Sequence, residues 1–115
     1  MRIAVSSQNF KTITGHAGKT RRFLIYEAES GSEPTEIERL DLPKELSLHE
    51  YRGTDHPLYQ RGLSAIVTAS AGPRFVERMQ EQGINVITTA ESDVGEALKA
   101  IAAGKPLPPA APHEH

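Results

Sequence analysis

The chain has 115 residues and a mass of 12.6 kDa, which is the size of a single domain. It has no cysteine, so disulfides, thiolate metal ligands and cysteine nucleophiles are excluded. A net charge of −2 and a pI of about 6.2 do not supply the broad basic footprint that nucleic-acid binding requires. No apolar run reaches the ~20 residues of a membrane span and no secretory signal opens the chain, so we expect a cytoplasmic protein without a membrane partner.

The first half of the chain predicts three strands. The β-branched run at 2–6 is typical of a buried strand, and 7–19 of a loop. A second apolar run covers 22–27, and 35–42 alternates polar and apolar residues as a half-exposed strand does. The link between the last two strands is too short for a crossover helix, so we expect them to form an antiparallel hairpin.

After a polar segment, the second half predicts a β-α-β-α unit. A short helix is expected around 57–61, and 63–69 reads as a buried strand. Pro73 suits the first turn of the next helix, and Gly83 is expected to end it.

The last elements are a strand over 84–88 and a helix capped by Ser92 or Asp93. Residues 105–115 are rich in proline and predict a flexible tail. The sequence therefore predicts one α/β domain over 1–104, with a mixed sheet, an antiparallel hairpin and flanking helices.

Positive and negative charges are separated along the chain. The first 22 residues carry five cations and no carboxylate, whereas residues 23–50 carry eight carboxylates and two cations. Those carboxylates are Glu27, Glu29, Glu33, Glu36, Glu38, Asp41, Glu45 and Glu50. The division predicts one cationic and one acidic region, either of which could simply be a solvated surface.

The turn from the strand at 63–69 into the next helix is a candidate anion site. In an open sheet, ligands collect beyond the carboxyl ends of the parallel strands, where this turn and the loop at 7–19 should meet. The free amides of a helix start favour an anion, Gly72 leaves them accessible, and Arg74 adds positive charge. The alternative is a tight turn that needs Gly72 only for its backbone.

The loop at 15–18, with the sequence GHAG, is a second candidate. His16 lies between small, flexible residues, and Lys19 and Arg21 follow closely. A neutral imidazole can ligate iron, and a protonated one would add to the positive field. The alternative is a surface histidine without a role.

The other histidines are weaker candidates. His56 precedes a proline and could be a helix cap, a surface residue or a second ligand, of which the first two are favoured. His49 lies in a polar stretch and is expected to be solvated. His113 and His115 end the tail, where they could pick up stray divalent metal without forming a specific site.

Enzyme chemistry is disfavoured by what the sequence lacks. Ser6 and Ser7 follow a strand, but no Ser-His-acid spacing or nucleophile elbow accompanies them. The carboxylates of the predicted hairpin alternate with apolar residues, as a solvent-facing side of a strand does. We therefore expect a non-catalytic protein.

Several segments in order carry a likeness to a known family. They are MRIAV at 1–5, GHAG at 15–18, RFLIY at 22–26, AIVTASAGPRF at 65–75 and GKPL at 104–107. Together they resemble the dinitrogenase iron–molybdenum cofactor biosynthesis family, which includes the NifX and NafY carriers and the C-terminal domain of NifB. The likeness covers residues 1–107.

This resemblance implies a ribonuclease H-like fold with a mixed five-stranded sheet. It also implies binding and transfer of the iron–molybdenum cofactor or its iron–sulfur precursor, with nitrogenase assembly proteins as partners. His16 matches the histidine of the family's Gly-His-x-Gly loop, whereas Ala17 stands where a bulky aromatic residue is usual. The nuclease of the same fold needs a carboxylate on the first strand, and the stretch 2–8 has none.

The leading hypothesis is thus a non-catalytic metallocluster carrier. His16 would be the metal ligand, while Lys19, Arg21, Arg74 and the amides at Gly72 would hold the charge of the cluster. The alternative is a protein-interaction or regulatory module that has the fold, binds no cluster and uses the acidic hairpin as its partner surface.

Overall fold

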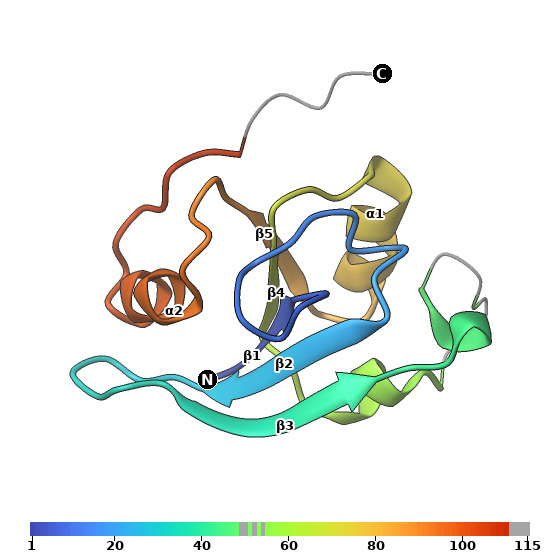
Figure 1. The fold of residues 1–115 in the computed structure, drawn as a ribbon, viewed down its shortest axis with the longest axis horizontal. Helices are drawn as coiled ribbons and strands as arrows, with labels where there is room; N and C mark the ends of the chain where they lie inside the picture. Colours follow the sequence, from blue (N-terminus) through green and yellow to red (C-terminus); the bar gives the residue numbers. More distant parts are fainter. Residues whose placement is uncertain (49–50, 52, 54, 111–115) are drawn as a thin grey trace.

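The computed structural model describes residues 1–48, 51, 53 and 55–110 and contains a five-stranded sheet of order β3-β2-β1-β4-β5 (Figure 1). The strands are β1 (Arg2–Ser6), β2 (Arg22–Glu27), β3 (Thr35–Asp41), β4 (Ala65–Thr68) and β5 (Asn85–Thr88). The helices are α1 (Pro73–Glu81) and α2 (Val94–Ala102), with two 3-10 helices, η1 (Lys44–Leu46) and η2 (Pro57–Gln60). None of these helices is long and apolar enough to cross a membrane.

The sheet is mixed, as the sequence predicts. β2 runs antiparallel to both β1 and β3, whereas β4 runs parallel to β1 and β5. The carboxyl ends of the three parallel strands therefore meet at one edge of the sheet. The loop after β1 and the turn into α1 both begin there, which brings the two predicted site segments together.

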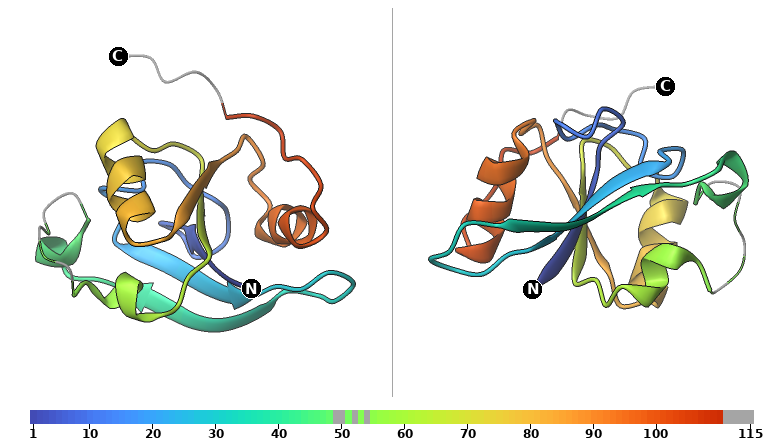
Figure 2. Two further views of the ribbon diagram at one scale, coloured as in Figure 1. Left: turned by 180° about the vertical axis from the view of Figure 1, so that it is seen from behind. Right: turned by 60° about the horizontal axis from the view of Figure 1, so that its bottom comes forward.

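Helices cover both faces of the sheet (Figure 2). Along β1, Ile3 and Val5 pack with the apolar side of α2, while Ala4 packs with α1 and the 3-10 helices. All three side chains are fully buried because successive strand residues point to opposite faces. The sheet centre thus has two cores, and each fully buried aliphatic side chain contributes about 1.5–3 kcal/mol.

The hairpin departs from the simple alternation expected for 35–42. The pairing of β2 with β3 shifts register between Ile25 and Tyr26, so that Ile37 lies at a bulge. Leu40 is buried against the α1 face, but Ile37 is 46% exposed. The extra residue of a bulge leaves the regular pleat, which explains why this apolar side chain faces solvent.

The helix ends follow the predicted chemistry. Pro73 occupies the first turn of α1, and Gly83 follows its end with a φ of 74°. Asp93 caps α2, since its carboxylate accepts a hydrogen bond from the Glu96 amide at 2.9 Å. The alternative cap, Ser92, is wrong; its carbonyl instead accepts from the Ile13 amide at 2.9 Å and ties the first loop to α2.

The first part of the proline-rich tail lies against the domain. The Pro108 carbonyl accepts hydrogen bonds from the Thr89 hydroxyl at 2.7 Å and the Ala90 amide at 3.1 Å. Leu107 packs at the edge of the α2 core. Residues 111–115 are outside the described residues, and the flexibility of the tail stays a prediction.

Candidate functional site

An open pocket of about 590 Å³ lies between the loop after β1 and the start of α1. Four of the five residues expected to hold a cluster line it, namely His16, Lys19, Gly72 and Arg74. The fifth, Arg21, is exposed but is not among the lining residues. Its carbonyl accepts from the Leu42 amide at 2.8 Å, so its backbone belongs to the base of the β2–β3 hairpin.

His16 is held in an unusual backbone conformation. Its φ of 55° lies in the left-handed region, which costs a non-glycine residue about 1–2 kcal/mol. The His16 carbonyl accepts from the amides of Lys19 at 2.8 Å and Thr20 at 2.9 Å, closing a tight turn. The side chain is exposed at the pocket, where an imidazole can meet a ligand. Strain held in place at a concave site is a feature of functional positions.

The neighbours of His16 fix the loop against the body of the protein. Ala17 is fully buried in the α1-side core. A Cβ added to Gly15 would lie 2.6 Å from the hydroxyl oxygen of Ser70, which is closer than atoms can approach. The glycine at position 15 therefore lets this loop approach the β4–α1 turn without displacing the Ser70 hydroxyl.

The start of α1 offers unused hydrogen-bond donors to the pocket. Gly72 is the N-cap and has no side chain to bond the first turn, and Pro73 has no amide hydrogen. The amides of Arg74 and Phe75 have no acceptor among the described residues. Such amides, together with the helix dipole, favour an anion at this position.

Three cations and two carboxylates are among the residues that line the pocket. Lys19 and Arg74 form no ion pair with any described residue. Arg78 also lines the pocket, but its guanidinium donates to the carbonyls of Leu48 and Tyr51. These hydrogen bonds hold the backbone in place and occupy donors that a ligand would need. Two carboxylates of α1 line the same pocket, Glu77 and Glu81.

The acidic region of the sequence is largely neutralised. Among the described residues, five ion pairs involve its carboxylates, four with cations elsewhere in the chain and one with Arg39 of the same region. They are Arg2–Glu27, Arg22–Asp41, Arg39–Glu36, Arg61–Glu38 and Lys99–Glu33. Five carboxylates of the expected acidic surface are therefore paired with cations, at positions that remain accessible to solvent.

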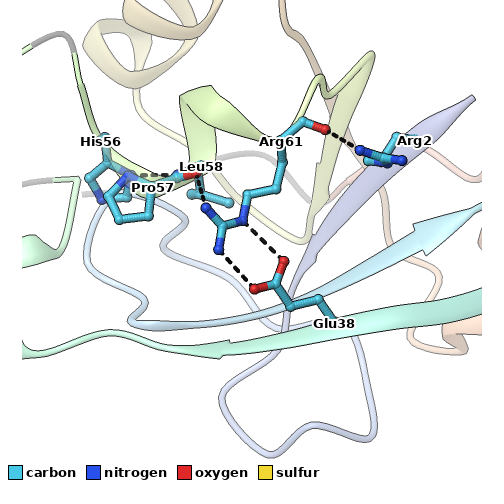
Figure 3. A network of polar contacts seen from close by, with 6 residues as sticks. All are labelled: Arg2, Glu38, His56, Pro57, Leu58 and Arg61. Carbon is cyan, nitrogen blue, oxygen red and sulfur yellow. Dashed lines mark hydrogen bonds and ion pairs between the residues drawn. The ribbon is translucent and has the colours of Figure 1, made fainter.

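One of these pairs belongs to a longer network behind the hairpin (Figure 3). Arg61 donates to both carboxylate oxygens of Glu38, at 3.0 and 2.8 Å, and to the Pro57 carbonyl at 2.7 Å. Arg2 in turn donates to the Arg61 carbonyl at 2.8 Å. The hydrogen bonds from Arg61 lower the pKa of the Glu38 carboxyl below its ordinary value, because they favour its charged form.

His56 is a buried helix cap. Its Nδ1 accepts from the Leu58 amide at 3.1 Å, as Figure 3 shows, and its Nε2 faces the Leu46 carbonyl at 2.6 Å. The ring is therefore neutral, with its proton on Nε2. Burial lowers its pKa, and the nearby Arg78 and Arg61 guanidiniums lower it further. The cap prediction is confirmed and the surface alternative is wrong; His49, His113 and His115 lie outside the described residues.

The site offers one imidazole and a positive field rather than a closed metal cage. Among the described residues, no three His, Asp or Glu side chains converge as a metal site does. Within the pocket, the sequence identified Ser70 only as a small residue of the turn and did not reveal its contacts. Its contacts to the His16 loop join positions 54 residues apart, so no local pattern could have revealed them.

Comparison with known families decides the relationship of this chain. A family model described as dinitrogenase iron–molybdenum cofactor matches residues 1–104. The chain belongs to this family. The prediction from the sequence is thereby confirmed, and it connects the protein with nitrogen fixation. A search of curated proteins finds no match.

Solved structures share the fold. The protein PH0822 is 23% identical, with a TM-score of 0.69 over 91% of this chain and 93% of that one. A Methanocaldococcus jannaschii protein described as a candidate dinitrogenase is 13% identical, with a TM-score of 0.64 over 90% and 89%. A Thermotoga protein described as a candidate NifB protein of the DUF35 family is 21% identical, with a TM-score of 0.57 over 90% and 88%. At these identities the likeness shows the fold alone.

Proposed function

We propose that this member of the dinitrogenase cofactor family is a non-catalytic carrier that binds and transfers the iron–molybdenum cofactor or its iron–sulfur precursor. The cluster is cargo, received from one nitrogenase assembly protein in the cytoplasm and passed to another. His16 is its iron ligand. Lys19, Arg74 and the amides after Gly72 balance its negative charge, and Arg21 adds to the field from outside the pocket.

The observation that carries the proposal is that His16 shares one pocket with the start of α1 and with two cations that form no ion pair with any described residue. A cluster that carries negative charge needs positive groups that are not already paired, and Lys19 and Arg74 meet this condition among the described residues. A single imidazole and an open pocket also suit cargo, because a carrier has to release what it binds. A closed set of ligands would retain it.

The proposal extends to the fold class and to the absence of catalysis. The strand order is 3-2-1-4-5, with β2 antiparallel to β1 and β4 parallel to β1. This arrangement supports a ribonuclease H-like fold. In the pocket, the Ser70 hydroxyl contacts a backbone amide and not a histidine or carboxylate that could activate it. The residues there are thus suited to binding.

The proposal is tested by loading the protein with isolated iron–molybdenum cofactor under anaerobic conditions, followed by gel filtration and iron and molybdenum analysis. We expect nearly one cluster per wild-type chain and loss of most of it in His16→Ala, because the chain has no cysteine to replace the imidazole. His113→Ala, a histidine change in the tail, is the matched control and should retain the cluster. Urea unfolding of each variant shows whether it is folded.

Two outcomes contradict the proposal. One is a wild-type protein that elutes free of metal, which would favour an interaction or regulatory module. The other is a folded His16→Ala variant that retains as much cluster as the wild type. In the first case the acidic hairpin would have to act as the partner surface, although five of its carboxylates are already paired.

A further inference from the structure

Ser70 accepts hydrogen bonds from the amides on either side of the His16 Cα, those of His16 and Ala17. Its hydroxyl oxygen accepts from the His16 amide at 2.8 Å, and its carbonyl accepts from the next amide, that of Ala17, at 3.2 Å. Ser70 follows β4, so these bonds join the loop after β1 to the neighbouring parallel strand. The same carbonyl lies 3.1 Å from the Thr68 hydroxyl, which can donate its one hydrogen either to it or to the Thr14 carbonyl at the same distance.

These contacts act on a residue whose backbone conformation is strained. His16 has a positive φ, which an L residue leaves readily when nothing holds it. Rotation of its φ would turn the Cα–Cβ bond and change the direction of the imidazole. The bonds to the His16 carbonyl close the turn from within the loop, whereas the Ser70 hydroxyl is the contact that fixes its amide to the rest of the protein.

The fit between the two segments supports a specific arrangement. Gly15 approaches the Ser70 hydroxyl so closely that a Cβ there would lie 2.6 Å from it. A larger residue at position 15 would displace the Ser70 hydroxyl from this contact. The Ser70 hydroxyl therefore fits against Gly15 only because glycine has no side chain, and this fit depends on how the loop packs on the turn.

We propose that Ser70 is a positioning residue, whose hydroxyl holds the His16 backbone in the left-handed conformation and so aims the imidazole into the pocket. The inference rests on the proposed role of His16 as the ligand of the cargo. It assigns to Ser70 an indirect role, since Ser70 acts through the His16 amide and not on the cluster iron.

Amide hydrogen exchange followed by NMR tests the positioning without any cargo. In the wild type the His16 amide should be protected. Ser70→Ala should speed its exchange by roughly tenfold, the effect of losing one hydrogen bond. The Ala17 amide is an internal reference, because its acceptor is the backbone carbonyl of residue 70, which the variant keeps. Ser64→Ala, at an exposed serine outside the pocket, is the matched control.

Cluster loading tests the consequence. Ser70→Ala should retain several-fold less isolated iron–molybdenum cofactor than Ser64→Ala, and Ser70→Thr, which keeps the hydroxyl, should recover most of the retention. Gly15→Ala leaves Ser70 in place but displaces its hydroxyl, so it should lose retention as Ser70→Ala does. A general structural defect would not be rescued by threonine.

The outcomes separate this inference from the proposed function. If His16→Ala loses the cluster while Ser70→Ala keeps it with an unchanged His16 amide, the inference fails and the carrier function stands. If His16→Ala keeps the cluster, the carrier function fails whatever Ser70 does. Should Ser70→Ala not fold, fast exchange of the His16 amide in the folded wild type would still overturn the inference.

Discussion

Two charged regions of this small domain differ in how their charges are used. In the ion-pair region, formed by the β2–β3 hairpin with Arg2, Arg61 and η2, carboxylates and cations are joined to one another. In the pocket, Lys19 and Arg74 meet no carboxylate within ion-pair distance among the described residues. In the sequence, the two regions differ in the sign of their charges. In the structure, they differ in whether those charges form ion pairs.

The difference matters because a paired charge has little left for a ligand. A carboxylate such as Glu38, which already accepts two bonds from Arg61, would have to break them before it could bind a cationic partner. An unpaired cation only exchanges water and counterions for an incoming anion. We therefore place structure in the first region and binding in the second, and the following predictions test that division.

The largest effect is expected for His56→Ala on the free energy of unfolding. The change removes the cap of η2 and leaves the partly buried Leu46 carbonyl and the buried Leu58 amide without their partner. Lost cap, unsatisfied groups and cavity together should cost about 2–4 kcal/mol in urea unfolding. His16→Ala is the matched control at an exposed histidine and should stay within about 0.5 kcal/mol of the wild type. Equal losses at both positions would contradict the division.

A second contrast uses charge reversal and cluster binding. Arg74→Glu should weaken retention of iron–molybdenum cofactor by roughly 10–100-fold at low salt, because it replaces a cation of the anion site with a carboxylate that repels the cluster. Lys99→Glu changes the net charge by the same amount, but Lys99 lies on α2 and forms an ion pair with Glu33. It should leave retention nearly unchanged. Similar losses in both variants would mean that only the net charge matters, and no loss in Arg74→Glu would place the site elsewhere.

The pH dependence of stability sharpens the structural side of the comparison. Burial lowers the pKa of His56 from its ordinary value of 6.5, so the unfolded chain takes up this proton before the folded chain does. Stability is therefore complete above the ordinary pKa and decreases as the pH falls through it toward the lower pKa of the folded state. Urea unfolding between about pH 7 and pH 5 should show this decrease, at a pH where carboxylates are still charged.

The variant His56→Asn provides the control for this pH series. Asparagine can also accept a bond at an N-cap but does not titrate, so the decrease attributed to His56 should disappear. The same slope in the variant would assign the pH dependence to other groups. A wild-type stability that does not change over this range would contradict a buried, neutral His56.

Local patterns in the sequence predicted most of the fold. Alternation and β-branched runs placed the strands, while Pro73 and Gly83 marked the ends of a helix, because these signals act within a few residues. The bulge that exposes Ile37 was missed, since a register shift depends on the partner strand. The short helix η1 was missed too, because its three residues carry no periodicity.

The sequence predicted which segments meet at the candidate site, but not the contacts between them. The loop at 15–18 and the turn at Gly72 were found from residue type and from the rule that ligands collect at the carboxyl ends of parallel strands. Pairing was beyond reach, because Arg2 with Glu27 or Arg61 with Glu38 are contacts between distant parts of the sequence. The same applies to Ser70, whose role depends on meeting His16 in space.

The smallest predicted effect concerns the strain stored at His16. A residue with a φ of 55° pays a cost that glycine does not, because glycine has no Cβ to approach the following carbonyl. His16→Gly should therefore be more stable than His16→Ala by about 0.5–1 kcal/mol, after allowance for the greater freedom of glycine in the unfolded chain. Urea unfolding of the two variants measures this difference, and both should lack cluster retention since both lack the imidazole. If alanine proves as stable as glycine, the left-handed conformation is not imposed by the fold. The loop at the pocket would then be relaxed. Strain at His16 would no longer be a difference between the pocket and the ion-pair region.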